Sequence, residues 1–214
     1  MTRRKRILWA AYSLAYDALW DNGCTAAAAA AVIAELDPSL PVEEVGAGTG
    51  LVTQHLVAAG LHVTASEPDP WMRRRFRSRL ASTPLGNGGI EDLRDERSGP
   101  ASVIAVNVVH LTQDPVAAIA ELRRRATARG RVVVVTPCPS ATLLSVGRAQ
   151  RRIGVTRLHV MRFIALHVVL APLTILAQGS KAPGRDAVAL SAGADRTTTL
   201  DDASRLLVFS GDGS

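Results

Sequence analysis

Four short segments of the chain carry side chains that could together hold a charged small molecule. A glycine turn, Gly46-Ala47-Gly48-Thr49-Gly50, follows Glu44 and allows a ligand to approach the backbone closely. Glu67 adds a second carboxylate, Asn107 an amide and His110 an imidazole. Carboxylates attract a cationic ligand and an imidazole can accept a proton, so this set is suited to binding a cation and to proton transfer.

The spacing of the turn separates it from two common nucleotide-binding loops. A phosphate-cradling loop has Lys and then Ser or Thr after its last glycine, but Leu51-Val52 stand here. A dinucleotide-binding turn places its third glycine three residues after the second, whereas Gly48 and Gly50 are two residues apart. Glu44 would repel a diphosphate, and Glu67 could accept hydrogen bonds from both hydroxyls of a ribose. The sequence therefore favours a cationic nucleoside without phosphate, such as S-adenosylmethionine.

Alternating strands and helices must position these side chains. Each candidate segment follows an apolar run, and parallel strands bring their carboxyl ends to one edge of a sheet, where ligands bind. The stretch from Thr83 to Gly89 is rich in glycine and proline, so any third strand there must be short. The expected strands are Pro41–Val45, Leu61–Ser66, Ala101–Val106 and Arg131–Thr136, and the expected helices are Leu51–Ala59, Asp69–Leu80 and Pro115–Ala128.

The ordered motifs resemble those of class I S-adenosylmethionine-dependent methyltransferases of the small-molecule type. The resemblance begins at Val42–Gly50 and continues through Val63–Asp69, Ile90–Leu93, Asn107–Leu111 and Gly130–Val135. It covers roughly residues 40 to 137. The glycine turn alone would be a weak signal, but the ordered set is specific.

The resemblance implies a role for each matching residue. The turn glycines would lie along the methionyl and ribose parts of the cofactor, Glu67 would bind the ribose hydroxyls, Pro68 and Ile90 would flank the adenine, and Asn107 would lie near the methionyl end. The full set of expected cofactor contacts is Glu44, Gly46, Ala47, Gly48, Gly50, Glu67, Pro68, Ile90, Glu91 and Asn107.

One position departs from the family pattern. Gly89 stands where the family often has an aspartate that reads the adenine amino group. Three explanations stay open: Asp92 substitutes for it, the backbone makes the contact, or affinity is reduced.

The alternation of strands with helices and the resemblance to class I methyltransferases together predict the fold class. We expect an α/β, Rossmann-like, doubly wound and mostly parallel seven-stranded sheet with helices on both faces. Residues 1–214 would form one methyltransferase domain, with an N-terminal helical lid (1–38), a cofactor-binding core (40–137), a helical substrate cap inserted after the fifth strand (138–185) and edge strands (186–214). The edge strands are expected at Ala187–Leu190 and Leu206–Phe209, with a polar run, Asp195–Asp202, between them.

Two residues are candidates for catalysis. His110, at the end of a strand, is the expected general base if the acceptor must lose a proton. Tyr16 is the second candidate, with positioning a better assignment than proton transfer, because Tyr16-Asp17 resembles a Tyr-Asp element that closes over the cofactor in many small-molecule methyltransferases. The sequence contains no metal-ligand cluster.

Two added segments are expected to meet the acceptor. Half of the eight aromatic residues fall within the first twenty positions, spaced to share one side of a helix that would form the lid: Trp9, Tyr12, Tyr16 and Trp20. The substrate cap has an apolar face that includes Val160, Phe163, Ile164 and Val168. That face could meet an apolar acceptor, pack as ordinary core or touch lipid.

Charge and composition limit the other function classes. The formal net charge is +6, carried almost entirely by arginine, and the arginine runs favour solvated helix faces over nucleic-acid binding because no nucleic-acid-binding motif accompanies them. Two cysteines favour a reducing compartment, and we expect a cytoplasmic protein. Phe163–Ala177 is shorter than the ~20 residues that cross a bilayer, so no membrane span is expected and peripheral membrane contact stays open.

The expected function is methyl transfer from S-adenosylmethionine to a small, apolar or amphipathic acceptor. The alternative is a non-catalytic methyltransferase-like binding or scaffold protein, one version of which associates with a membrane. An RNA methyltransferase is disfavoured because Asn107-Val108-Val109-His110 stands where the Asn/Asp-Pro-Pro-aromatic motif of amino-group nucleic-acid methyltransferases would be.

Overall fold

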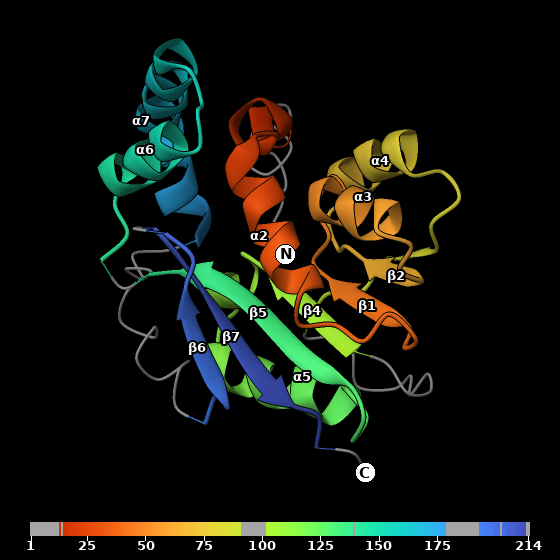
Figure 1. The fold of residues 1–214 in the computed structure, drawn as a ribbon. Helices are drawn as coiled ribbons and strands as arrows, with labels where there is room; N and C mark the ends of the chain where they lie inside the picture. The colour runs from red at the N-terminus through yellow and green to blue at the C-terminus, as the bar shows by residue number, and fades with distance from the viewer. Residues whose placement is uncertain are drawn as a thin grey trace.

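Seven strands form one sheet in a computed structural model that describes residues 13, 15–90, 102–138, 140–178, 193–201 and 203–212. The strand order is β3-β2-β1-β4-β5-β7-β6 (Figure 1). All pairings from β3 to β5 are parallel, and β7 is antiparallel to both β5 and β6. The strands are β1 (Val42–Val45), β2 (Val63–Ser66), β3 (Leu85–Gly86), β4 (Ser102–Val106), β5 (Arg131–Pro137), β6 (Arg196–Thr199) and β7 (Ser204–Ser210).

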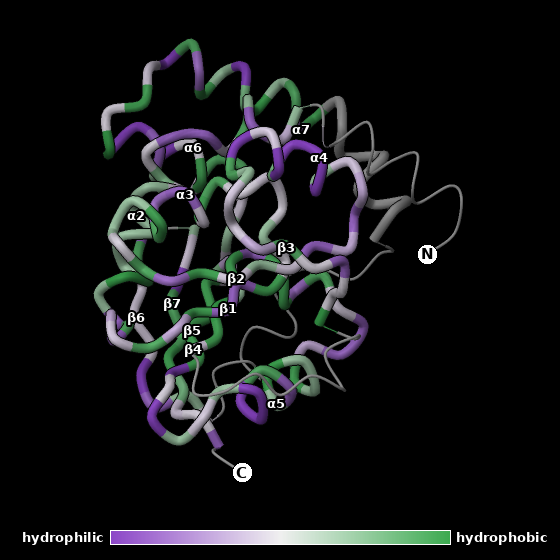
Figure 2. The backbone as a smooth tube through the Cα atoms, turned by 90° about the vertical axis from the view of Figure 1, so that its right-hand side faces the viewer, coloured by the Kyte–Doolittle hydropathy of each residue, from purple (hydrophilic) through white to green (hydrophobic). Residues whose placement is uncertain are grey.

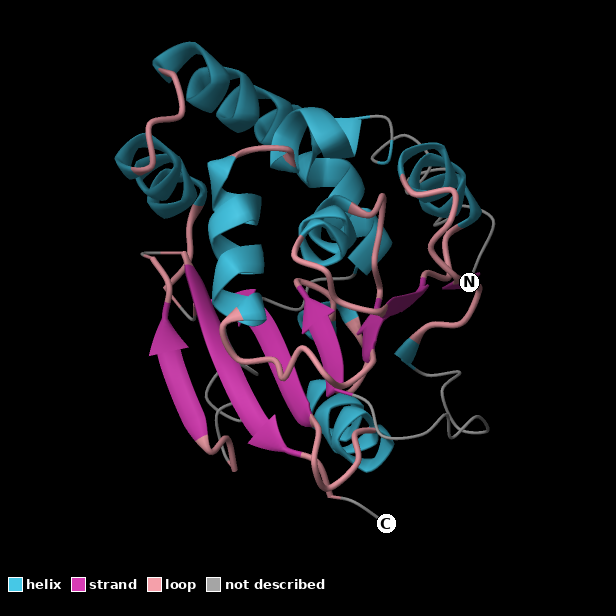
Figure 3. Ribbon diagram, turned by 45° about the vertical axis from the view of Figure 1, so that its right-hand side comes forward, coloured by secondary structure: helices cyan, strands magenta, loops and turns pink. Residues whose placement is uncertain are grey.

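Helices cover both faces of the sheet, as Figure 3 shows. Buried side chains of α2 and α3 pack on one face of the central strands, and those of α5 pack on the other. The predicted doubly wound, mostly parallel fold is therefore confirmed. The described helices are α2 (Gly23–Ile33), α3 (Leu51–Ala58), α4 (Pro70–Arg79), η2 (Val109–Leu111), α5 (Pro115–Arg125), α6 (Leu143–Arg152) and α7 (Arg157–Gln178).

Two helices, α4 and α5, begin with the same N-terminal cap, an aspartate followed by a proline. In α4 the Asp69 carboxylate accepts hydrogen bonds from the N–H groups of Trp71 and Met72, and Pro70 occupies the first turn. Asp114 caps α5 in the same way ahead of Pro115. Asp-Pro favours a helix start for two reasons. The aspartate side chain accepts hydrogen bonds from backbone N–H groups of the first turn, which have no partner within the helix, and proline lacks an N–H that would need one. These starts agree with the sequence, whereas α5 ends at Arg125 instead of Ala128 because Ala126 is already extended.

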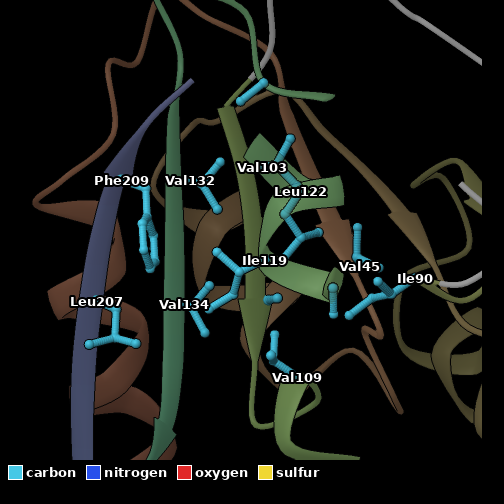
Figure 4. Close-up of a cluster of buried hydrophobic side chains, with 13 residues drawn as sticks. Val45, Ile90, Val103, Val109, Ile119, Leu122, Val132, Val134, Leu207 and Phe209 are labelled. Atoms are coloured by element: carbon cyan, nitrogen blue, oxygen red, sulfur yellow. The ribbon is translucent and has the colours of Figure 1, made fainter. Parts of the chain in front are cut away.

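Aliphatic side chains, mainly valine and leucine, make up most of the core cluster that packs on α5, and Phe209 adds one buried ring (Figure 4). Four consecutive valines of β5 are fully buried: Val132 and Val134 face α5, while Val133 and Val135 face α2 and α3. A strand that is buried on both faces reads as a continuous apolar run, which is why β5 is the clearest strand in the sequence.

The C-terminal edge differs from the sequence expectation. The predicted pair of strands at this edge is present, but the strand expected at Ala187–Leu190 lies outside the described residues. β6 is instead formed by Arg196–Thr199, within the polar run that we expected to be a connection, and that expectation was wrong. All four residues of β6 are exposed, so the strand has no apolar alternation, and threonine fits an exposed edge strand through its β-branched side chain.

The helical insertion stands where the sequence placed it. α6 begins after β5, with Thr142 and Ser145 forming a capping box, and a short turn leads into α7. Both helices lie beyond the carboxyl end of β5, on the side of the sheet where the lid also lies (Figure 1). We call α6 and α7 the cap helices.

Gly50 and Gly60 offer a matched test of how tightly the glycine turn is packed. Both have a left-handed backbone, with φ of 83° and 82°. A Cβ at Gly50 would lie 2.9 Å from the Phe76 ring, whereas one at Gly60 would meet nothing within 4 Å. Gly60→Ala should therefore cost about 1 kcal/mol of backbone strain, and Gly50→Ala about 1–3 kcal/mol more. Urea unfolding measures both; equal losses would contradict the packing explanation.

Candidate functional site

The glycine turn is fastened to β2, the neighbouring strand. The N–H groups of Gly46 and Ala47 both donate to the Ser66 carbonyl oxygen, at 2.9 and 3.0 Å. The N–H of Gly48 donates to Glu67 Oε2 at 2.8 Å. Consecutive backbone donors of the turn are thus used within the protein, and they hold the turn at the carboxyl ends of β1 and β2.

Glu67 is held in place by two backbone hydrogen bonds. Its Oε2 accepts from Gly48, and its Oε1 accepts from the N–H of Asp69 at 2.8 Å. Burial raises the pKa of Glu67, and these two hydrogen bonds oppose the rise. Each carboxylate oxygen has two acceptor positions, so each oxygen could accept one further hydrogen bond from a ligand hydroxyl.

Glu44 is the second carboxylate of the site and is buried within β1. Its Oε2 accepts a hydrogen bond of 2.5 Å from the Thr53 hydroxyl of α3. Burial raises the pKa of Glu44 to about 7; the bond from Thr53 opposes this rise, and the charge of Glu67 adds to it. The ends of β1 and β2 therefore hold two buried carboxyl groups, whose charged forms a cationic ligand would stabilise.

Residues 15–20 of the lid lie against the glycine turn. The Asp17 carboxylate accepts a 2.5 Å hydrogen bond from the Thr49 hydroxyl, and it pairs at 3.1 Å with both Arg75 and Arg79 of α4. A Cβ at Gly48 would lie 3.8 Å from the Tyr16 ring, so this ring covers the middle of the turn. The expected proximity of Tyr16-Asp17 to the turn is therefore seen in the structure.

Asn107 and His110 follow β4, opposite the turn. Asn107 is the only described non-glycine residue with a left-handed backbone, at φ 55°, a conformation that Asn adopts more readily than most residues. His110 lies in η2, and its buried Nδ1 has no hydrogen-bond partner within the described residues. Burial lowers the pKa of His110 to about 4, so its imidazole is neutral at pH 7 and free of a proton at one nitrogen.

Trp20 connects the lid to the cap helices. Its ring makes edge-on contacts with Phe163 and His167 of α7, at centroid distances of 5.4 and 5.7 Å. The Phe163 and His167 rings are themselves 4.2 Å apart. This aromatic cluster joins two segments that are distant in the sequence.

The remaining residues predicted to line the site differ in their burial and in whether the structure describes them. Pro68 is exposed at the end of β2, and Ile90 is buried beside Val45 in the core cluster that packs on α5. Gly46 is required by packing, because a Cβ there would lie 2.6 Å from Val108. Glu91, Asp92, Trp9 and Tyr12 lie outside the described residues.

The sequence analysis missed the arginines that support the site. The arginine run of α4 was expected to be a solvated face, which is wrong for at least two of its members. Arg73 donates to the carbonyl oxygens of Glu67 and Pro68, at 2.8 and 2.7 Å, and Arg79 donates to the Thr49 carbonyl as well as to Asp17. The only signal for this role is the helical spacing that puts Arg75 and Arg79 on one side of α4.

Metal and membrane sites were sought in the described residues. No group of three or more His, Cys, Asp or Glu side chains there is arranged to hold a metal ion. No helix within that part of the chain has the length and apolarity to cross a membrane.

Known proteins resemble the chain in the sequence of its central region and in its fold. A family model described as a methyltransferase domain matches residues 44–132, which contain the glycine turn, both carboxylates, Asn107 and His110. This part of the chain is a methyltransferase domain. The predicted methyltransferase family is thereby confirmed for residues 44–132, and no curated protein sequence matches the chain.

Several solved structures are similar to the chain. A structure from work on the conversion of a disulfide bond into a thioacetal group during echinomycin biosynthesis has a TM-score of 0.58 and 15% identity, covering 87% of this chain and 81% of that one. The CcbJ methyltransferase from Streptomyces caelestis is 27% identical over 54% of this chain and 49% of its own, with a TM-score of 0.46.

A third solved structure is the glycopeptide N-methyltransferase MtfA complexed with S-adenosyl-L-methionine. It is 22% identical over 54% of this chain and 57% of its own, with a TM-score of 0.47. The chain thus covers about half of the length of CcbJ and of MtfA.

The raised pKa of Glu44 predicts how stability changes with pH. The native state holds this proton up to about pH 7, whereas an unfolded glutamate releases it near 4.5. Stability from protonated Glu44 is therefore complete below pH 4.5 and is lost as the pH rises through 7, by up to ~3 kcal/mol. Glu44→Gln should remove this loss, so its unfolding free energy relative to the native chain should increase between pH 5 and 8. Urea unfolding across that range measures the difference.

Glu121→Gln, on the surface of α5, is the control for this measurement. Its difference from the native chain should stay nearly constant with pH. A Glu44→Gln difference that is equally flat would contradict the assignment of a buried, protonated carboxyl group.

Proposed function

We propose that the chain transfers a methyl group from S-adenosylmethionine to a small, apolar or amphipathic acceptor. The two buried carboxylates, Glu44 and Glu67, support this proposal most directly. They stand at adjacent strand ends of a methyltransferase domain, and burial raises the pKa of both. A cationic cofactor would offset the cost of two buried negative charges.

The residues present fit this cofactor. Glu67 is fixed by two N–H donors and keeps acceptor capacity for the ribose hydroxyls. Gly48 presents backbone without a side chain beneath the Tyr16 ring, and Glu44 supplies negative charge for the cationic part. We assign the remaining contacts to Ala47, Pro68, Ile90, Glu91 and Asn107. When bound, S-adenosylmethionine supplies a methyl group that its sulfonium has already activated.

The protein's main task is then to align the acceptor with the methyl group. Holding two reactants in place can contribute about 7–11 kcal/mol toward the barrier. Asp17 ties the lid to the turn, which places Tyr16 over Gly48 and keeps water from that side. Trp20 packs on Phe163 and His167 of the cap, and an apolar cluster joining lid and cap supports an apolar acceptor.

His110 is our candidate for proton removal from the acceptor. Its imidazole is neutral at pH 7 because burial lowers its pKa to about 4, and Nδ1 makes no described hydrogen bond. A neutral imidazole nitrogen can accept a proton as the acceptor attacks the methyl group. Tyr16 would position the acceptor and would not carry the proton.

Cofactor binding tests the assignment of Glu67. Glu67→Ala should weaken binding of S-adenosylhomocysteine at least ~10-fold, because it removes the ribose partner and releases the Gly48 N–H. Isothermal titration calorimetry measures the affinity. Glu67→Gln, which keeps the size of the side chain, separates loss of charge from loss of packing, and unfolding curves show whether the variants fold. Unchanged affinity in both variants would refute the ribose assignment.

Methyl transfer tests the rest of the proposal. The chain is incubated with S-adenosylmethionine labelled on the methyl group and with a cell extract, and the products are separated by size. Label should enter the small-molecule fraction, and His110→Ala should lower its rate about 100-fold while S-adenosylhomocysteine affinity stays within about twofold. A normal rate in that variant would exclude His110 as the base.

The same experiment distinguishes the alternatives. Absence of labelled product together with absence of cofactor binding would support the non-catalytic scaffold. Label in RNA, with binding that falls steeply as salt is raised, would instead support a nucleic-acid substrate.

A further inference from the structure

The cap helices carry an apolar stripe that faces solvent. α7 packs on α6 near Gly147 through Val160 and Ile164, but a second face of the same helix is exposed. Exposed apolar residues recur on it at intervals of three, four and three, which place them in one row along the helix. They are Leu158, Met161, Ala165 and Val168, and the three larger ones are 67%, 67% and 59% exposed.

Two further exposed apolar residues belong to α6 and to its connection to α7. Leu144 is 68% exposed, and Ile153, after the end of α6, is also exposed. Figures 1 and 3 show the cap helices at the outer end of the molecule, away from the sheet, and in Figure 2 apolar and hydrophilic residues alternate closely along them. An exposed apolar row of this kind marks an interaction surface when other groups define its partner.

The charges around the stripe have one sign. Residues 138–185 contain seven of the 25 basic residues and none of the 19 acidic residues. Helical spacing puts Arg157 on one border of the stripe and Arg162 on the other, and both are exposed. Arg148, Arg151 and Arg152 of α6 are exposed as well.

We propose that this stripe with its bordering arginines docks the chain onto an anionic lipid surface. Apolar side chains bordered by arginine suit the boundary between anionic headgroups and acyl chains. Nucleic acid would use the arginines but would leave the apolar row without a partner. A second copy of the chain would place these arginines against each other, because a twofold interface pairs the same surface with itself.

The inference does not depend on methyl transfer. It is argued from the exposure, spacing and charge of residues in α6 and α7. The experiment measures lipid binding, so its result is independent of whether the chain transfers methyl groups. If both hold, the acceptor site beside Phe163 opens near a lipid surface, which would favour an amphipathic acceptor.

Vesicle co-sedimentation of the full chain tests the proposal. The chain should bind vesicles that mix phosphatidylcholine with anionic phosphatidylglycerol, and should bind phosphatidylcholine vesicles at least ~10-fold more weakly. The double variant Leu158→Asp, Met161→Asp should bind the anionic vesicles at least ~10-fold more weakly than the native chain. Both side chains are exposed, so the variant should keep its unfolding curve.

Val116→Asp is the matched control. Val116 is also an exposed apolar residue, 52% accessible, but it lies on α5, which covers the other face of the sheet. This variant should bind anionic vesicles as the native chain does.

Three results would overturn the proposal. They are absence of vesicle binding by the native chain, equal loss in the control and the stripe variant, and a native dimer that the stripe variant converts to a monomer. The last result, measured by sedimentation velocity, would assign the stripe to a second copy of the chain.

Discussion

The bond between Glu67 and the Gly48 N–H joins the two strand ends on which the site depends. A carboxylate at the end of β2 reaches the turn that follows β1, while its other oxygen holds the N–H of Asp69. Asp69 then starts α4, and α4 supplies the arginines that hold Asp17 of the lid. One buried charge thus connects strand, turn, helix and lid. Because a buried carboxylate is costly unless several donors share it, these connections stabilise one another.

The lid precedes the methyltransferase core in the sequence and the cap follows it, yet the two are in contact. Asp17 fixes one end of the described lid to the glycine turn, and Trp20 places the other end against Phe163 of α7. The same short helix therefore contacts both the glycine turn, which we propose binds the cofactor, and the cap, which we propose faces the acceptor. This arrangement gives Tyr16 and Trp20 a positional role, since Tyr16 lies over the glycine turn and Trp20 contacts the cap.

Much of the fold could be predicted because its signals are local. The four valines of β5, the glycine spacing after β1 and the Asp-Pro starts of α4 and α5 each specify their structure within a few residues. β6 could not be predicted, since an exposed strand of Arg196–Thr199 has no apolar periodicity. The site was predicted where it follows strand ends. Its support was not, because Asp17 and Arg79 are 62 residues apart and only the tertiary structure brings them together.

The place of β7 in the sheet has a consequence for how the protein is made. β7 pairs with β5 along seven residues and also carries β6, yet it comes after both in the sequence. The methyltransferase core from β1 to β5 is therefore synthesised while one edge of β5 still has no partner. An uncovered, strongly apolar strand edge is prone to pair with other chains. The growing chain thus passes through a period in which its glycine turn can form but the free edge of β5 is open to aggregation, and pairing with β7 ends that period.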